Sequence, residues 1–232
     1  MPSKNRIKTF LRNGYYHIYN RGVNKRSIFT DQQDYRVFLS YLKTYLTPKD
    51  EVSLRTSLAD STIPWSEKDK ILKLLRLNNF ADTIKLLAFV LMPNHFHLLI
   101  QQFETESISA LLGSLGTRYV MYFNRKQQRK GPLFQDIYKA VVVETDEQLL
   151  HLSRYIHLNP RSILKNQPAL AEYQYSSYSQ YLGKYPVSWV DPKPILQFFK
   201  SVRDPANNTY KEFVETHQEF PGNLQKLTLD ED

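Results

Sequence analysis

The most apolar stretch of the chain lies between residues 86 and 101, and a turn signal divides it in two. Pro93-Asn94 stands between two strand-like runs, which is typical of neighbouring antiparallel strands. Side chains alternate along a strand, so His95 and His97 would share one face while Phe96 faces the other way. The pattern therefore predicts a hairpin that carries two histidines near one end of a sheet.

The rest of the hydrophobic pattern changes between period two and periods of three and four. Thr145-Asp146-Glu147-Gln148 has the form of a capping box, and Pro160 disfavours helical geometry at the residue before it. In chain order, the expected elements are strand 14–20, a helix after Asp31 to about Leu46, strands 86–92 and 95–101, a helix from Ser107, strand 137–144 and helix 146–159. This order predicts an α+β fold of the ferredoxin-like type, βαββαβ, with a four-stranded antiparallel sheet and an extra helix after the last strand.

Two segments lie outside this pattern. Residues 47–84 have the character of an insertion, in which Ser66 would cap an amphipathic helix. After a Tyr/Ser-rich connection over 161–185, helical patterns recur near 193–202 and 205–217. We therefore expect a main domain over 1–160, with its helical insertion, and a connection with a helical extension over 161–232.

Composition limits the classes that the chain can belong to. Its 232 residues are 41% hydrophobic, which suits one large domain or a domain with an appendage. The absence of cysteine excludes disulfides and thiolate metal sites. No signal-like apolar core occurs at the N-terminus, and the run 86–92 is too short for a membrane span. We expect a soluble, cytoplasmic protein.

The formal net charge of +8 is concentrated in two clusters. Both clusters are interleaved with tyrosines, and cationic side chains beside aromatic faces are typical of surfaces that bind single-stranded nucleic acid. A solvated basic surface is the favoured explanation for either cluster taken alone, and an anionic membrane is a weaker option because neither cluster is a long amphipathic basic helix. The first cluster contains Lys4, Arg6, Lys8, Arg12, Arg21, Lys25 and Arg26, and the second Arg118, Arg125, Lys126, Arg129 and Lys130.

The helix 146–159 supplies further polar groups. Tyr155 and Asn159 are four residues apart, so their side chains project from the same side of that helix. Each also has a plain structural interpretation: Asn159 ends a helix before Pro160, and Tyr155 packs its ring with a hydrated hydroxyl. A histidine pair on a half-buried strand is likewise often only packed or solvated.

Several motifs together resemble one family. They are Pro93-Asn94-His95-Phe96-His97, Tyr155-Ile156-His157-Leu158-Asn159-Pro160, Tyr16-His17-Ile18-Tyr19-Asn20-Arg21-Gly22, Gly131-Pro132-Leu133-Phe134-Gln135 and Tyr175-Ser176-Ser177-Tyr178. Over roughly residues 14–182, the chain resembles the single-tyrosine HUH transposases, in particular the IS200-like, REP-associated tyrosine transposases. The insertion at 47–84 departs from this resemblance.

The resemblance implies a site and a reaction. His95 and His97 would be ligands of a divalent metal, Mg²⁺ or Mn²⁺, and Asn159 would complete the site. His151, one turn before Tyr155, would be a possible extra ligand. Tyr155 would be the nucleophile that cleaves and rejoins single-stranded DNA at hairpin elements through a covalent 5′-phosphotyrosine.

The resemblance also indicates partners. Hairpin or single-stranded DNA would bind to Arg12, Arg21, Lys25, Arg26, Arg118, Arg125, Lys126, Arg129 and Lys130. Neither a membrane nor a small-molecule cofactor is expected, and the chain would act as a monomer or a homodimer.

Other functions stay open at this point. A non-catalytic single-stranded nucleic-acid-binding protein is the main alternative, although the RNP1 pattern of one such class is not visible. An HUH relaxase or replication initiator would use the same chemistry, and a metal-dependent hydrolase is a weaker alternative. Should Tyr155 not be the nucleophile, Tyr119, Tyr122 and Tyr138 are the other tyrosines to test.

Overall fold

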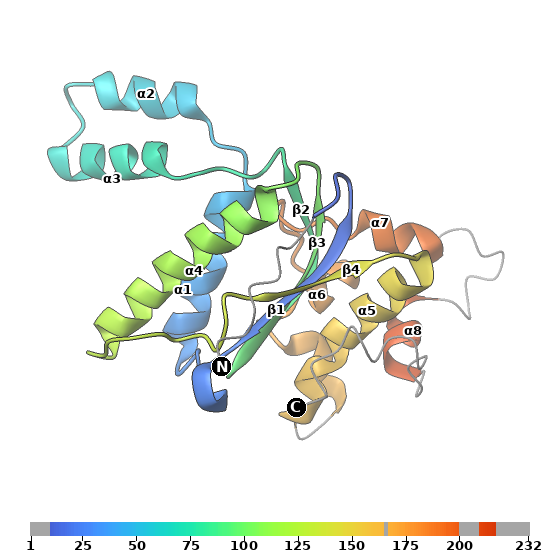
Figure 1. The fold of residues 1–232 in the computed structure, drawn as a ribbon. Helices are drawn as coiled ribbons and strands as arrows, with labels where there is room; N and C mark the ends of the chain where they lie inside the picture. Colours follow the sequence, from blue (N-terminus) through green and yellow to red (C-terminus); the bar gives the residue numbers. More distant parts are fainter. Residues whose placement is uncertain (1–9, 165–166, 200–208, 217–232) are drawn as a thin grey trace.

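A four-stranded antiparallel sheet lies at the centre of the fold (Figure 1). The computed structural model describes residues 10–164, 167–199 and 209–216. The sheet has the order β2-β3-β1-β4, and each neighbouring pair is antiparallel. With the chain order strand, helix, strand, strand, helix, strand, this arrangement confirms the predicted ferredoxin-like fold class. The strands are β1 (Tyr15–Arg21), β2 (Ile84–Met92), β3 (His95–Gln102) and β4 (Lys139–Val143).

Three long helices pack around the sheet: α1 (Gln32–Leu46), α4 (Ser107–Lys126) and α5 (Asp146–Leu158). The capping box predicted at the start of α5 is present. The Thr145 hydroxyl accepts a hydrogen bond from the Gln148 backbone N–H, and Gln148 Oε1 accepts one from the Glu144 N–H. The first bond satisfies a donor that the helix start leaves open, and the second fixes the residue before the cap, so the sequence sets where α5 begins.

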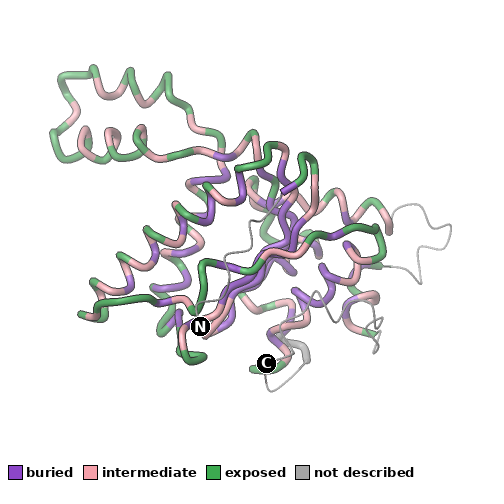
Figure 2. Tube along the Cα trace, in the orientation of Figure 1, coloured by how far each residue is buried: buried purple, intermediate pink, exposed green. Residues whose placement is uncertain are grey.

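The two faces of the sheet are covered by different helices. α1 and α4 cover one face, and α5 with the C-terminal helices covers the other (Figures 1 and 2). Phe96, Leu98 and Ile100 belong to the apolar core on the α1 and α4 side, whereas Leu99 belongs to the core that includes α5. The alternation predicted for β3 is therefore confirmed, and it directs His95 and His97 toward α5.

The expected insertion forms a helical arm that projects from the body of the protein (Figure 1). It consists of α2 (Glu51–Ala59) and α3 (Trp65–Arg76), and neither helix contains a buried residue (Figure 2). The helix predicted in this part of the insertion is present, but Pro64 is its N-cap residue, so Ser66 lies in the first turn and the prediction that it caps the helix is wrong. α2 was not predicted, because its sequence has no strong apolar face.

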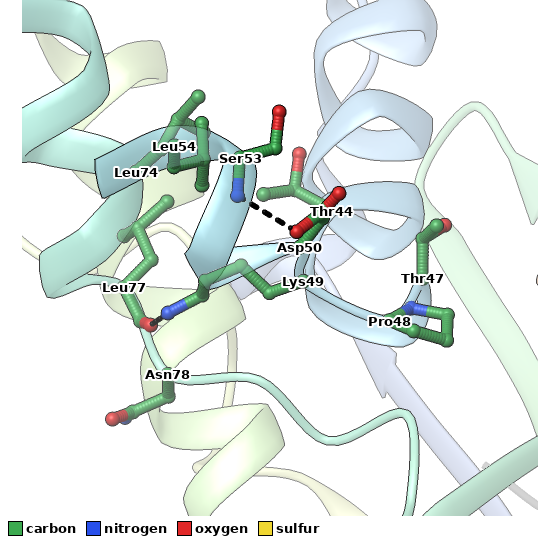
Figure 3. A pocket seen from close by; sticks show the side chains of 10 residues that line it. All are labelled: Thr44, Thr47, Pro48, Lys49, Asp50, Ser53, Leu54, Leu74, Leu77 and Asn78. Carbon is green, nitrogen blue, oxygen red and sulfur yellow. Dashed lines mark hydrogen bonds between the residues drawn. The ribbon is translucent and has the colours of Figure 1, made fainter. Parts of the chain in front are cut away.

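A pocket of about 270 Å³ lies where the arm meets the end of α1 (Figure 3). Lys49 lines this pocket, and its ammonium group donates hydrogen bonds to the backbone carbonyls of Leu75 and Leu77. These bonds tie the two ends of the arm together. The remaining lining residues are Thr44, Thr47, Pro48, Asp50, Ser53, Leu54, Leu74 and Asn78.

The segment after α5 is more ordered than the expected connection over 161–185. It contains short helices, and its backbone pairs with the edge of β2 through Leu91 N to Tyr175 O (2.8 Å) and Ser177 N to Phe89 O (3.0 Å). The described helices of this segment are η2 (Asn159–Ser162), η3 (Gln167–Glu172), α6 (Tyr178–Tyr181), α7 (Lys193–Leu196), η4 (Gln197–Phe199) and α8 (Tyr210–Thr216).

The helical extension shares its core with α5. Tyr178, Ile195 and Val214 are buried in the same apolar cluster as Ile156 of α5. The two helical patterns expected near 193–202 and 205–217 correspond to α7 with η4 and to α8, while residues 200–208 and 217 lie outside the described residues. The division of the chain at residue 160 into a main domain and an extension stays a prediction. In the described part of the chain, none of the helices has the length and apolar character that crossing a membrane requires.

Candidate metal and nucleophile site

The turn between β2 and β3 is fixed by the loop that follows β1. Gly22 N–H donates to the carbonyl of Asn94 (2.9 Å), and Ile28 N–H donates to the carbonyl of Pro93 (2.8 Å). A Cβ on residue 22 would lie 2.2 Å from the carbonyl oxygen of Arg26, so only glycine fits there. The loop therefore holds the hairpin end, and with it the first residue of β3, in one position.

His95, that first residue, has polar partners on both ring nitrogens. Nδ1 lies 2.6 Å from Asn94 Oδ1, and Nε2 lies 3.1 Å from Asn159 Oδ1. A neutral ring that donates Nδ1–H to Asn94 has a lone pair on Nε2 that faces Asn159 Oδ1, and a cation between these two atoms would stabilise that arrangement. The hairpin and the end of α5 thus meet at this imidazole.

His97 is fully buried beside His95. The two ring centroids are 5.0 Å apart at an interplanar angle of 86°. Burial, followed by the positive charge that His17, His95 and Arg21 can carry, holds the pKa of His97 well below its usual value. Nε2 of His97 is buried and has no hydrogen-bond partner. The ring is therefore neutral at pH 7 and has one unused nitrogen.

α5 brings Tyr155 and Asn159 to the same place. The Tyr155 ring stands edge-on to His97, with centroids 5.4 Å apart at 87°, and Tyr155 is only 8% exposed. Asn159 caps the C-terminus of α5, and its amide oxygen reaches His95. Of the site residues that the resemblance implies, His95, His97, Tyr155 and Asn159 thus lie together in the structure.

The sequence analysis did not single out His17 as a site residue. Its Nε2 lies 2.8 Å from His97 Nδ1, and the two rings are stacked with centroids 5.0 Å apart. The sequence feature that could have indicated His17 is its polar side chain within an apolar strand, on the same face as Tyr15 and Tyr19. This feature does not reveal the contact with His97, because the pairing register between β1 and β3 is not visible in the sequence.

The donor set fits a divalent metal. A separation of 3.1 Å between His95 Nε2 and Asn159 Oδ1 suits neighbouring ligands of an octahedral ion, which lie about 3 Å apart when each bond is about 2.1 Å long. Nε2 of buried His97, which has no hydrogen-bond partner, is a further candidate ligand atom. Among the described residues, no group of three or more His, Asp or Glu side chains could hold a metal, so an amide oxygen would have to complete the site.

Comparison with known proteins gives a family match for part of the chain. Residues 63–159 match the model of a family described as "Transposase IS200 like", and the match includes both histidines, Tyr155 and Asn159. This segment is therefore similar to IS200-like transposases. The resemblance predicted from the motifs is thereby confirmed for this part of the chain.

Two solved structures are also similar. One is a REP-associated tyrosine transposase bound to a REP hairpin, with 14% identity, a TM-score of 0.49 and coverage of 82% of this chain and 92% of that chain. The other is a candidate transposase from Deinococcus radiodurans R1, with 15% identity, a TM-score of 0.26 and coverage of 67% and 95%. These values are too low to transfer residue roles or partners. No curated protein sequence matches the chain.

The members of the second basic cluster divide into two groups. Arg118 stacks on Tyr41, with the guanidinium carbon 3.8 Å from the ring centroid, Lys126 forms ion pairs with Asp31 and Asp34, and Arg129 donates to Asn124 and the Pro132 carbonyl. These three side chains therefore make contacts within the folded chain. Arg125 and Lys130 are exposed to solvent, so they are the members best placed to meet a phosphate backbone.

The first cluster is described in part. Lys4, Arg6 and Lys8 lie outside the described residues. Arg12 forms an ion pair with Glu104 (3.0 Å), and Lys25 and Arg26 are exposed on the loop that supports the hairpin turn. Arg21 lies opposite His95 in the sheet register, and its Nε is buried without a hydrogen-bond partner.

His151 lies farther along α5 and faces the C-terminal helices. Its ring is edge-on to Phe213 of α8, with centroids 5.4 Å apart. This packing gives His151 a structural environment, and its part as an extra metal ligand stays a prediction.

The alternative tyrosines lie on the other face of the sheet. Tyr119 and Tyr138 belong to the core beneath α1 and α4, and Tyr122 packs against it and donates to Asp34. Burial raises the pKa of Tyr119 far above its usual value and that of Tyr122 to about 12. Of these candidates and Tyr155, only Tyr155 belongs to the apolar core on the His97 side of the sheet.

Proposed function

We propose that the chain cleaves and rejoins single-stranded DNA next to a hairpin, with Tyr155 as the nucleophile and a divalent metal held by His95, His97 and Asn159. The proposal refines the transposase class that the family match gives. The observation that carries it is the meeting of the three metal-ligand candidates with one phenol, at 3.1 Å between His95 and Asn159 and 5.4 Å between the His97 and Tyr155 rings.

The chemistry follows from these groups. A bound Mg²⁺ or Mn²⁺ would supply Lewis-acid polarisation of the scissile phosphate. The phenol of Tyr155 loses its proton and its oxygen bonds to phosphorus, while the bond to the 3′ oxygen breaks and that oxygen leaves as a 3′-hydroxyl after protonation. The result is a 5′-phosphotyrosine with a released 3′ end. Attack by another 3′-hydroxyl on this linkage reverses the step and frees the phenol, so no nucleotide cofactor is needed.

Side chains around the site would orient the substrate. Arg21 lies beside His95 and has an unused buried Nε–H, so its guanidinium is a suitable donor to a phosphate oxygen. The exposed basic residues Lys25, Arg26, Arg125 and Lys130 would bind the backbone of the flanking strand or the hairpin stem. The packed environment of Tyr155 keeps the nucleophile in one orientation, which favours attack along a single line.

A non-catalytic single-stranded nucleic-acid-binding protein is the main rival. The basic and aromatic surface would suit it, but the unpartnered buried nitrogen of His97 beside a phenol would then serve no purpose. An HUH relaxase or replication initiator would share the chemistry and differ in its DNA substrate.

The test is a covalent-adduct assay on the full chain. Randomised hairpin oligonucleotides with single-stranded flanks, labelled at either the 5′ or the 3′ end, are incubated with MnCl₂ or with EDTA and separated under denaturing conditions. We expect the 3′-labelled part to migrate with the protein and the 5′-labelled part to be released, only when Mn²⁺ is present. The double variant His95→Ala, His97→Ala should form no adduct.

Two results would speak against the proposal. Cleavage that is unchanged in EDTA would exclude the metal role of the histidine pair. Tight binding of hairpin oligonucleotides with no adduct under any metal condition would favour the non-catalytic binder.

A further inference from the structure

His17 and His97 form a buried imidazole pair between β1 and β3. Both residues are 0% exposed, and His17 Nε2 lies 2.8 Å from His97 Nδ1. Their rings are nearly parallel, at 18°, and both stand edge-on to the Tyr155 ring, with centroids 6.2 and 5.4 Å away. One proton must lie between the two facing nitrogens, because two lone pairs at this distance would repel.

The position of that proton decides what His97 can bind. If His17 donates, Nδ1 of neutral His97 is the acceptor and Nε2 carries the hydrogen. A buried N–H without an acceptor is destabilising, and it cannot bind a cation. If His97 donates through Nδ1–H, its Nε2 keeps a lone pair. Only the second arrangement makes His97 a ligand.

We propose that His17 is a positioning residue that accepts the Nδ1–H of His97 and thereby keeps the His97 Nε2 lone pair available to a divalent cation. This inference rests on the proposed function, because it assigns a partner to one of the proposed metal ligands. Asn94 has the corresponding place for His95, since its Oδ1 lies 2.6 Å from His95 Nδ1. Each histidine of the pair would then have its own fixed tautomer, as is usual for metal-binding imidazoles.

The proton position can be measured without metal or DNA. In the uniformly ¹⁵N-labelled full chain, long-range ¹H–¹⁵N correlation spectra distinguish Nδ1–H from Nε2–H tautomers of each histidine. We expect His97 to be the Nδ1–H form. A His97 that is Nε2–H in the wild-type chain would overturn the inference, whatever the variants do.

Two variants of His17 test its effect on the cation. His17→Phe keeps an aromatic ring of similar size and removes the acceptor, whereas His17→Gln places an amide oxygen that can accept the same hydrogen. By electron paramagnetic resonance, the Mn²⁺ affinity of the Phe variant should fall about 10- to 100-fold, with the Gln variant within a few-fold of wild type. An unchanged affinity in a folded Phe variant would contradict the inference.

Internal controls separate folding from tautomer effects. The signals of His157, which bonds to Tyr210 and Ser177 behind α5, should be unchanged in a His17→Phe variant that keeps its fold. A chain that shows His17-dependent Mn²⁺ binding but forms no DNA adduct would refute the proposed function and leave this inference standing. A chain that forms the adduct but has His97 as the Nε2–H tautomer would refute this inference and leave the proposed function standing.

Discussion

His95 Nε2 lies 3.1 Å from Asn159 Oδ1, although 64 residues separate them in the chain. The contact joins the first residue of β3 to the residue that ends α5. Tyr155, one turn earlier on α5, lies against His97, two residues later on β3. The helix and the hairpin therefore make two neighbouring contacts, His95 with Asn159 and His97 with Tyr155. This arrangement would allow a nucleophile and a metal to act on one phosphate.

Replacing Tyr155 by Phe should abolish the covalent DNA adduct and leave hairpin binding nearly unchanged. The substitution removes the phenolic oxygen and keeps the ring that packs on His97. Tyr19→Phe is a matched control, because the Tyr19 ring also lies beside His97, with centroids 5.8 Å apart. The adduct is measured on a denaturing gel and binding by fluorescence anisotropy. An adduct that persists in Tyr155→Phe and disappears in Tyr19→Phe would move the nucleophile to β1.

Asn94→Ala should lower the affinity for Mn²⁺ about 10- to 100-fold. The change removes the Oδ1 atom 2.6 Å from His95 Nδ1, which fixes the ring and its tautomer. Titration calorimetry with MnCl₂ gives the affinity. Asn124→Ala removes another loop-supporting amide, away from the histidine pair, and should leave the Mn²⁺ affinity unchanged. Equal affinities for Asn94→Ala and wild type would contradict the assignment.

Arg125 and Lys126, at the end of α4, should differ in their effects on DNA binding and on stability. Arg125→Met should weaken hairpin binding and reduce the salt dependence of binding by about one counterion, with little change in stability. Lys126→Met should lower the free energy of unfolding by about 1–3 kcal/mol, because Lys126 pairs with the fully buried Asp34. Denaturant titrations and binding at several salt concentrations distinguish the two. Similar behaviour of the two variants would show that Lys126 is not held by its carboxylates in solution.

The buried His157 predicts a loss of stability in mild acid. Burial lowers its pKa to about 3, whereas in the unfolded chain the pKa is about 6.5. The unfolded state therefore binds an extra proton between these values, so stability is full above about pH 6.5 and is lost as the pH falls, by up to about 1.4 kcal/mol per pH unit. The lowered pKa of His97 acts with the same sign.

The variant His157→Gln isolates the contribution of His157. Its free energy of unfolding should depend on pH less steeply than that of wild type between pH 6 and 4, by about one proton. The amide retains a group that can bond Ser177, so the difference in slope is informative even when the variant is less stable overall. Identical slopes would show that His157 is protonated in the folded protein.

Much of the fold could be predicted from the sequence, because its local signals agree with the tertiary arrangement. The Pro93-Asn94 turn sits between two runs with clear alternation, and Thr145 and Gln148 cap α5 as a capping box should. α2 was missed because it buries no residue, so the hydrophobic period that reveals most helices is weak there.

The site could be predicted only in part. His95, His97, Tyr155 and Asn159 lie in short motifs whose order along the chain is recognisable. His17 was missed because its contact with His97 depends on the register between β1 and β3, in which Tyr19 pairs with His97 and His17 with Leu99. The sequence likewise does not show that Lys126 forms ion pairs whereas Arg125 is exposed. The partners of Lys126, Asp31 and Asp34, are distant from it in sequence and close to it in space.

Anomalous diffraction from crystals of the full chain soaked in MnCl₂ tests the central claim most directly. We predict one Mn²⁺ peak within bonding distance of His95 Nε2, His97 Nε2 and Asn159 Oδ1, on the side of the sheet that faces Tyr155. A structure with Mn²⁺ bound elsewhere, and with these three atoms uncoordinated at saturating metal, would contradict the proposed site.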